Sequence, residues 1–214
     1  MPNIINRIVK ILIASDFFLN LGWGLLSPIF ALFVLEKITI SDPMRAAEVA
    51  GAAALFYWIP KSFMEIPIGR FLDKTKGEKD DYWFMVAGLF IVGFVPLGYL
   101  FSTEPYHIYI FQILHAIGMA MTLPSWLAIF TRHIDKEKEA FEWSMETTSI
   151  GAGAGIAGGL GGLMAAQFGF DAIFIFVSAL TFLATLLLLI VKKDISSKIK
   201  DGARVSMEKP VVEP

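Results

Sequence analysis

The sequence predicts an all-α membrane protein with six transmembrane helices, arranged as an inverted repeat of three helices plus three. Composition is the first reason, because 56% of the residues are hydrophobic, only 18% are charged, and the mean hydropathy is +0.63. Such a chain is more apolar than a typical soluble domain. The second reason is that six apolar stretches reach the roughly 20 residues that a helix needs to cross a bilayer. The third is that charged residues cluster between these stretches.

The six predicted spans follow one another with short polar connections and form one domain, residues 1–192. Their ranges are approximately 8–35, 48–72, 82–102, 106–131, 142–166 and 170–192. Several contain proline, which membrane helices tolerate because neighbouring helices can satisfy the freed carbonyl groups. Residues 193–214 are polar, and we expect a disordered cytoplasmic tail there.

Lys and Arg residues lie mostly on one side of the predicted membrane domain. They precede the first span and follow the second, fourth and sixth spans, whereas only Lys37 and Arg45 occupy a loop on the other side. Cytoplasmic loops carry such an excess, so we expect both termini in the cytoplasm and a multi-pass protein of the cell membrane, plasma or inner. The first span does not predict a cleavable signal peptide, because its apolar run is too long and no small-residue cleavage site follows.

The two halves of the predicted domain repeat the same pattern of glycine and proline. Gly22 lies six residues before Pro28 in the first span, and Gly118 lies six residues before Pro124 in the fourth. Three spans that recur after an odd number of crossings must be inverted in the membrane. The alternative is coincidence, because glycine and proline are common in membrane helices.

The loop between the second and third spans reads GRFLDKTKGEK at residues 69–79, a compact charged turn with a glycine near each end. The pattern Gly-x-x-x-Asp-Lys at its start resembles the signature loop of the major facilitator superfamily (MFS) of transporters. Gly77 and Lys79 fit the rest of that signature with one additional residue. The resemblance implies that the loop is a cytosolic gating latch, formed by Gly69, Arg70, Asp73, Lys74, Lys76, Gly77 and Lys79.

The fifth span contains a run of small residues from 149 to 162. Small residues four positions apart form a groove into which another helix can settle, so we expect Gly151, Gly155, Gly159 and Gly162 to serve helix packing. The run is similar to the glycine-rich fifth-helix motif of the family's antiporters, although Ile156 stands where that motif has a proline.

Polar side chains recur at helical spacing on the first, second, fourth and fifth spans, whereas the third and sixth spans nearly lack them. Ionisable residues inside a span are costly unless they are paired or hydrated, so each one indicates a functional site. The family lines its central cavity with the same four helices. The candidates for a substrate or proton pathway are Asp16, Asn20, Trp23, Lys61, Glu65, Gln112, His115 and Glu146.

Some of these candidates have a simpler structural interpretation. Lys61 and Glu65 lie one helical turn apart, so a local ion pair is the alternative to a role in the pathway. Asp16 lies less than two turns into its span, close enough to reach the interface. His115 is deeper, and it is either a hydrogen-bonded packing residue or a proton carrier, since histidine titrates near neutral pH.

The resemblance implies a secondary active transporter rather than an enzyme. No Walker loop, zincin motif or nucleophile elbow occurs, and we expect no cofactor and no metal site. Family members have twelve spans in two bundles, so this chain is equivalent to one half, the N-terminal one, of an MFS transporter. We therefore expect a half-transporter that pairs as a homodimer or with another six-helix chain and moves a small solute by alternating access.

The expected partners are the lipid bilayer, the second bundle and an unidentified small solute, with protons as the candidate coupling ion. Nucleic acid is not expected, because the formal net charge is only −2. Two alternatives stay open at this stage. One is that the chain is a membrane scaffold or binding subunit that transports nothing itself. The other is that it is the truncated half of a split transporter.

Overall fold

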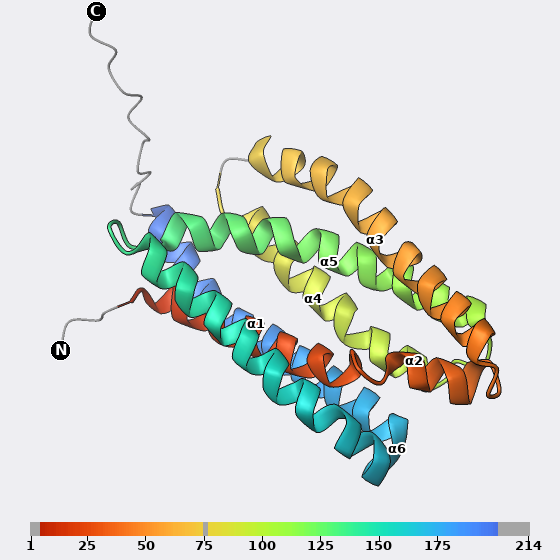
Figure 1. The fold of residues 1–214 in the computed structure, drawn as a ribbon. Coiled ribbons are helices and arrows are strands. Elements are labelled where there is room, and N and C mark those ends of the chain that lie inside the picture. The colour runs from red at the N-terminus through yellow and green to blue at the C-terminus, as the bar shows by residue number, and fades with distance from the viewer. Residues whose placement is uncertain (1–4, 75–76, 201–214) are drawn as a thin grey trace, which may run out of the picture.

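A computed structural model describes residues 5–74 and 77–200, and these ranges form an α-helical bundle without strands (Figure 1). The helices are α1 (Arg7–Leu26), α2 (Phe30–Phe33), α3 (Pro43–Lys74), α4 (Lys79–Tyr99), α5 (Pro105–His133) and α6 (Glu139–Lys200). A short π-helix, η1 (Val34–Ile38), follows α2. The all-helical prediction is confirmed for the part of the chain that the structure describes.

Helix α6 contains a break at Gly169, where the backbone angles φ 76° and ψ 175° are not helical. A positive φ favours glycine because it has no Cβ to clash with the following carbonyl. The chain reverses its direction at this residue, so residues 139–168 and 170–200 form two long segments (Figure 1). The break falls in the join predicted between the spans at 142–166 and 170–192.

Four helices in the described ranges are long and apolar enough to cross a membrane: α1, α4, α5 and residues Glu139–Lys192 of α6. Helix α3 was predicted as a span but is not among them. Its mean hydropathy is lower because Lys61 and Glu65 lie near its middle. The number of six spans and the inverted repeat of three plus three therefore stay predictions.

The structure departs most from the predicted spans at two boundaries. The first span was predicted as one helix over 8–35, but α1 ends at Leu26 and a turn around Pro28 separates it from α2. At the other end of the chain, α6 continues to Lys200, so the first residues of the predicted tail are helical. The remaining tail residues, 201–214, lie outside the described residues.

The core consists of side chains contributed by all the long helices. Helix α1 packs mainly against α6, whereas α5 packs against both α3 and α4. The contact between α4 and α5 is closest at Gly88 and Gly118, where a Cβ on either glycine would lie within 3 Å of the other's carbonyl oxygen. Gly118, selected from the sequence as part of the repeat, thus lies where two helix backbones meet.

Within the bundle, the glycine run of α6 meets α1 through residues other than the four selected from the sequence. A Cβ added to Gly161 would lie 2.4 Å from the carbonyl oxygen of Leu25, and Ala157 contacts Gly24 of α1. The four glycines predicted to serve packing have nothing within 4 Å of an added Cβ; they are Gly151, Gly155, Gly159 and Gly162. The run contains several four-residue registers, and the residue pattern alone did not distinguish the one that faces α1.

Candidate functional site

Two of the predicted pathway residues, Trp23 and His115, meet Tyr57 where α1, α3 and α5 come together. His115 of α5 stacks on Trp23 of α1 with ring centroids 3.9 Å apart. The ring of Tyr57, from α3, is tilted against the His115 ring with its centroid 4.6 Å away. The indole nitrogen of Trp23 is buried and has no hydrogen-bond partner among the described residues. Gln112 lies one turn before His115, half-buried. Both interpretations of His115, as a packing residue and as a proton carrier, stay predictions.

Lys61 and Glu65 form the ion pair that their spacing indicated. The distance from Lys61 Nζ to Glu65 Oε1 is 2.5 Å, and both residues belong to α3. The Lys61 ammonium also lies 5.2 Å from the ring centroid of Trp58. Only 7% of the Lys61 side chain is exposed, against 27% for Glu65. The carboxylate is therefore the more accessible member of the pair.

Asp16 and Glu146 come from different helices, and the structure brings their carboxyl groups into contact. Asp16 lies on α1, and Glu146 lies in the second turn of α6 with only 2% of its surface exposed. The side-chain amide of Asn20 donates to Asp16 Oδ2 at 3.1 Å and to the Asp16 carbonyl oxygen at 2.9 Å. The sequence placed these acidic residues on separate spans and did not predict their contact.

The predicted latch lies at the end of α3 and the start of α4. Arg70, Asp73 and Lys74 are exposed in the last turns of α3, and none forms an ion pair within the described residues. A Cβ on Gly69 would meet nothing within 4 Å. Gly77 has a φ angle of 134°, a backbone conformation that residues other than glycine rarely adopt.

The remaining charged members of the latch are Lys76 and Lys79. Lys79 begins α4, and Lys76 lies outside the described residues. The described charges of the latch are thus exposed, and none of them forms an ion pair with another described residue.

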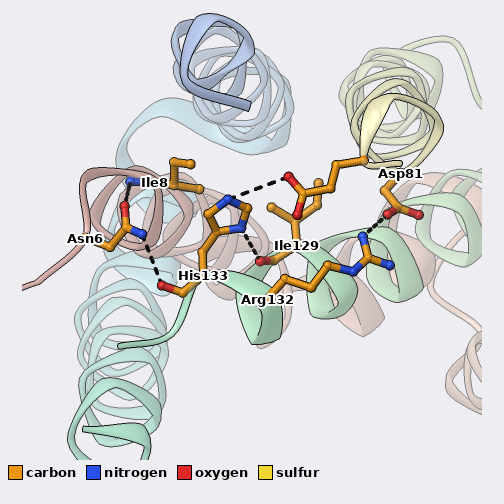
Figure 2. A network of polar contacts seen from close by, with 7 residues as sticks. Asn6, Ile8, Asp81, Ile129, Arg132 and His133 are labelled. Atoms are coloured by element: carbon orange, nitrogen blue, oxygen red, sulfur yellow. Dashed lines mark hydrogen bonds and ion pairs between the residues drawn. The ribbon is translucent and has the colours of Figure 1, made fainter. Parts of the chain in front are cut away.

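A polar network beside the latch was not predicted from the sequence. Figure 2 shows Arg132, near the end of α5, paired with Asp81 in the first turn of α4. The Asp81 side chain is fully buried, and its Oδ1 has no hydrogen-bond partner among the described residues. Neither Arg132 nor Asp81 was among the functional residues selected from the sequence. Their positions at a helix C-terminus and a helix N-terminus are favourable for a base and an acid, which is the signal that could have identified them.

The same network ties the start of α1 to the end of α5 (Figure 2). His133 Nδ1 donates to the carbonyl oxygen of Ile129 at 2.9 Å, and its Nε2 lies 3.6 Å from Glu78 Oε2. The Asn6 amide donates to the His133 carbonyl oxygen at 3.2 Å, while its own oxygen accepts from the backbone of Ile8 and caps α1. Three helix termini are thus held together at one end of the bundle.

Further charged contacts gather at this end. Arg7 of α1 lies 3.5 Å from Asp194 of α6, and Lys192 lies 4.7 Å from the ring centroid of Trp83. The described portion of the chain contains no group of three or more His, Asp or Glu side chains able to hold a metal ion. The candidate site thus has two parts. One is the set of polar side chains between helices within the bundle, such as His115, Lys61 and Asp16. The other is the charge network of Arg132 and Asp81, with the adjoining latch, at one end of the bundle.

The sequence model of the Major Facilitator Superfamily matches residues 12–212. The chain belongs to the major facilitator superfamily. Among solved structures, this MFS chain is similar to the POT family transporter PepTSo, known from an in meso crystal structure, with a TM-score of 0.73. The two chains are 20% identical, and the similarity covers 87% of this chain and 37% of the transporter. A comparison with curated protein sequences gave no significant match.

The family membership confirms the resemblance seen in the signature loop. Together with the apolar helices, it makes the MFS chain a multi-pass membrane protein of a transporter family. The likeness to PepTSo shows a shared fold, and this chain spans only 37% of the length of that transporter.

Proposed function

We propose that this MFS chain is one bundle of a secondary active transporter, and that it moves a small solute across the cell membrane by alternating access. In this proposal the bundle pairs with a second six-helix bundle, either another copy or a different chain, and both of its termini are cytoplasmic. The six spans and their inverted repeat are part of the same proposal.

One observation carries the proposal: the first segment of α6 exposes a face of glycines that contacts nothing in the described chain. An added Cβ at Gly151, Gly155 or Gly159 would have open space around it. Glycine faces in membrane helices allow close backbone contact with another helix, and a lone bundle gives this face no such helix. The partly exposed Glu65 and the exposed latch likewise lack a covering element.

The latch supports the same arrangement. Asp73, Arg70 and Lys74 extend from the end of α3 without ion-pair partners among the described residues. A second bundle would supply charges or a helix terminus opposite Asp73 in one state and withdraw them in the other. The charge network of Arg132 and Asp81 holds α4 and α5 together beside the latch, so that the latch can move against a fixed support.

Transport can be tested directly in proteoliposomes. We would reconstitute the purified complex and measure uptake of a panel of radiolabelled amino acids, sugars, nucleosides and organic cations. We expect uptake of at least one class, and its loss in Asp73→Asn, because the substitution removes the latch charge. Asp42→Asn is the matched control, since Asp42 is exposed and caps α3 at its other end through bonds that the amide oxygen of asparagine can also accept.

The scaffold alternative predicts a different result. A stable complex that moves no member of the panel, in either direction, would favour a binding or scaffold subunit. Uptake that persists unchanged in Asp73→Asn would contradict the gating role of the latch while leaving transport intact.

A further inference from the structure

The end of the bundle opposite the latch contains a cavity of about 540 Å³ that is separate from the candidate site. It lies between α2 with η1 on one side and the break of α6 on the other, away from the N-terminus (Figure 1). We call it the α2–α6 cavity. Its volume is within the range of pockets that hold small molecules and cofactors.

Departures from α-helical geometry form both walls of the α2–α6 cavity. On one wall, η1 is a π-helical turn, in which the Thr39 amide donates to the carbonyl oxygen of Val34, five residues earlier, at 3.0 Å. Such turns are rare and occur frequently at functional sites. On the other wall, the non-helical backbone of Gly169 ends the first segment of α6, where the small residues Gly162 and Ala166 line the space. The backbone of both walls therefore sets the shape of the cavity.

Aromatic packing joins the two walls. The ring centroid of Phe33, in α2, lies 5.7 Å from that of Phe170 and 4.8 Å from that of Phe174, both in the second segment of α6. All three rings are buried, and so is Ile29, which precedes α2 and lines the cavity. The cavity is thus a preformed feature of the bundle, as ligand sites usually are.

Three charged side chains line the cavity, and none of them forms an ion pair within the described residues: Glu36 and Lys37 of η1, and Asp171 of α6. Glu36 and Lys37 are consecutive, and consecutive residues of a helix do not face each other. All three residues are exposed, so their charges are accessible to a ligand.

The ligand that complements this lining carries both signs of charge. An ammonium group would donate to Glu36 or Asp171, and an anionic group would accept from Lys37, each through a charge-assisted hydrogen bond. A purely anionic ligand would be repelled by the two carboxylates, whereas a cation alone would leave Lys37 without a partner. Because Glu36 and Lys37 are neighbours in the chain, the two charges of the ligand have to lie only a few bonds apart.

We propose that the α2–α6 cavity binds a phosphoethanolamine group, a zwitterion whose primary ammonium group and phosphate are two carbons apart. Lysine is a common phosphate ligand, and a primary ammonium group donates to carboxylates. The group has two sources, the headgroup of phosphatidylethanolamine and free phosphoethanolamine. The lipid source fits the position of the cavity at helix ends, near the depth of lipid headgroups. It also fits the apolar lining residues Leu32 and Phe168, which are 43% and 65% exposed.

Native mass spectrometry of the chain released from lipid nanodiscs tests the lipid source, and it measures no transport. The discs contain equal amounts of phosphatidylethanolamine and phosphatidylcholine with the same acyl chains, so the headgroups differ in the hydrogen-bond donors of the ammonium group. We expect the wild type to retain phosphatidylethanolamine over phosphatidylcholine by about tenfold, the effect of one charge-assisted hydrogen bond. Glu36→Gln/Asp171→Asn should bring this ratio close to one, because it removes both carboxylates.

Lys37→Gln should act differently from the loss of the carboxylates. It should lower the retention of both lipids, because it removes the ligand of the phosphate that they share. Asp42→Asn and Arg45→Gln are the matched controls: both residues are exposed at the start of α3 and neither lines the cavity, so both variants should keep the wild-type ratio. Size-exclusion elution at the wild-type position would show that each variant is folded.

Calorimetric titration of phosphoethanolamine into the chain in phosphatidylcholine nanodiscs tests the free source. Binding that Lys37→Gln and Glu36→Gln/Asp171→Asn both abolish would assign the cavity to the free zwitterion, in addition to or instead of the headgroup. A lipid ratio that responds to the variants, without calorimetric binding, would assign it to the headgroup alone. The proposal is overturned if the wild type shows neither the lipid preference nor calorimetric binding, or if whichever effect it shows survives the substitutions in the lining.

Discussion

Arg132 shows what a single residue contributes to the end of the bundle. It pairs with Asp81, whose side chain is fully buried, so Arg132→Ala would leave a buried carboxylate without its charged partner. We expect the free energy of unfolding in detergent to fall by about 1–3 kcal/mol, the range for a buried group that loses its hydrogen-bond partner. The double variant Arg132→Ala/Asp81→Asn should recover part of this loss, because asparagine carries no charge to bury.

A surface pair provides the comparison for that prediction. The Arg7 side chain is 66% exposed and lies 3.5 Å from Asp194, so Arg7→Ala should change stability by less than about 1 kcal/mol. Equal losses in Arg7→Ala and Arg132→Ala would contradict a special role for the buried pair.

The residue-level contacts differ in how far sequence could predict them. Lys61 and Glu65 pair as predicted, because one helical turn fixes their separation. The contacts of Arg132 with Asp81 and of Asp16 with Glu146 join different helices. Helical periodicity places each residue on a face, but it does not determine which faces meet, so these partners could not be derived from one sequence.

The helix elements were predicted well in position and less well at their ends. The joins between predicted spans coincide with the loops and with the break at Gly169. The early end of α1 at Leu26 and the extension of α6 to Lys200 were not predicted. Hydropathy averages over many residues, whereas a helix end depends on local backbone geometry and contacts with its neighbours. The residue pattern likewise did not show which side of the glycine run faces α1, and packing through the four selected glycines stays a prediction.

That register can be tested with two adjacent glycines of α6. A Cβ on Gly161 would lie 2.4 Å from the Leu25 carbonyl oxygen, so Gly161→Ala should push α1 and α6 apart. We expect a loss of about 1–3 kcal/mol in unfolding free energy, typical of an overpacked contact. Gly162→Ala has open space and should be neutral or stabilising by up to about 1 kcal/mol, since alanine favours helix. Thermal unfolding of the two variants side by side measures the difference, and the reverse order would contradict the observed register.

At the scale of the whole molecule, the distribution of charge and hydrophobicity was the most informative property of the sequence. It predicted an all-helical membrane protein, and the family match and the fold agree. It could not show whether a second bundle completes the site, because the sequence of one bundle does not contain the surface of its partner. The open glycine face of α6 is the structural feature that addresses this question.

Pairing through this face is testable by cysteine crosslinking, because the chain has no cysteine of its own. Gly155→Cys places a thiol on the open face, whereas Leu186→Cys places one on the second segment of α6, where the side chain is 58% exposed. If two copies meet through the glycine face, a short bifunctional thiol reagent applied to membranes should link Gly155→Cys into a species of about twice the 23.7 kDa chain mass and leave Leu186→Cys monomeric.

Efficient linking at Leu186 without linking at Gly155 would place the interface elsewhere. Recovery of a different chain with the tagged Gly155→Cys protein would replace the homodimer by a heterodimer through the same face. A strictly monomeric protein at both positions, with no other chain captured, would contradict the pairing on which the half-transporter proposal depends.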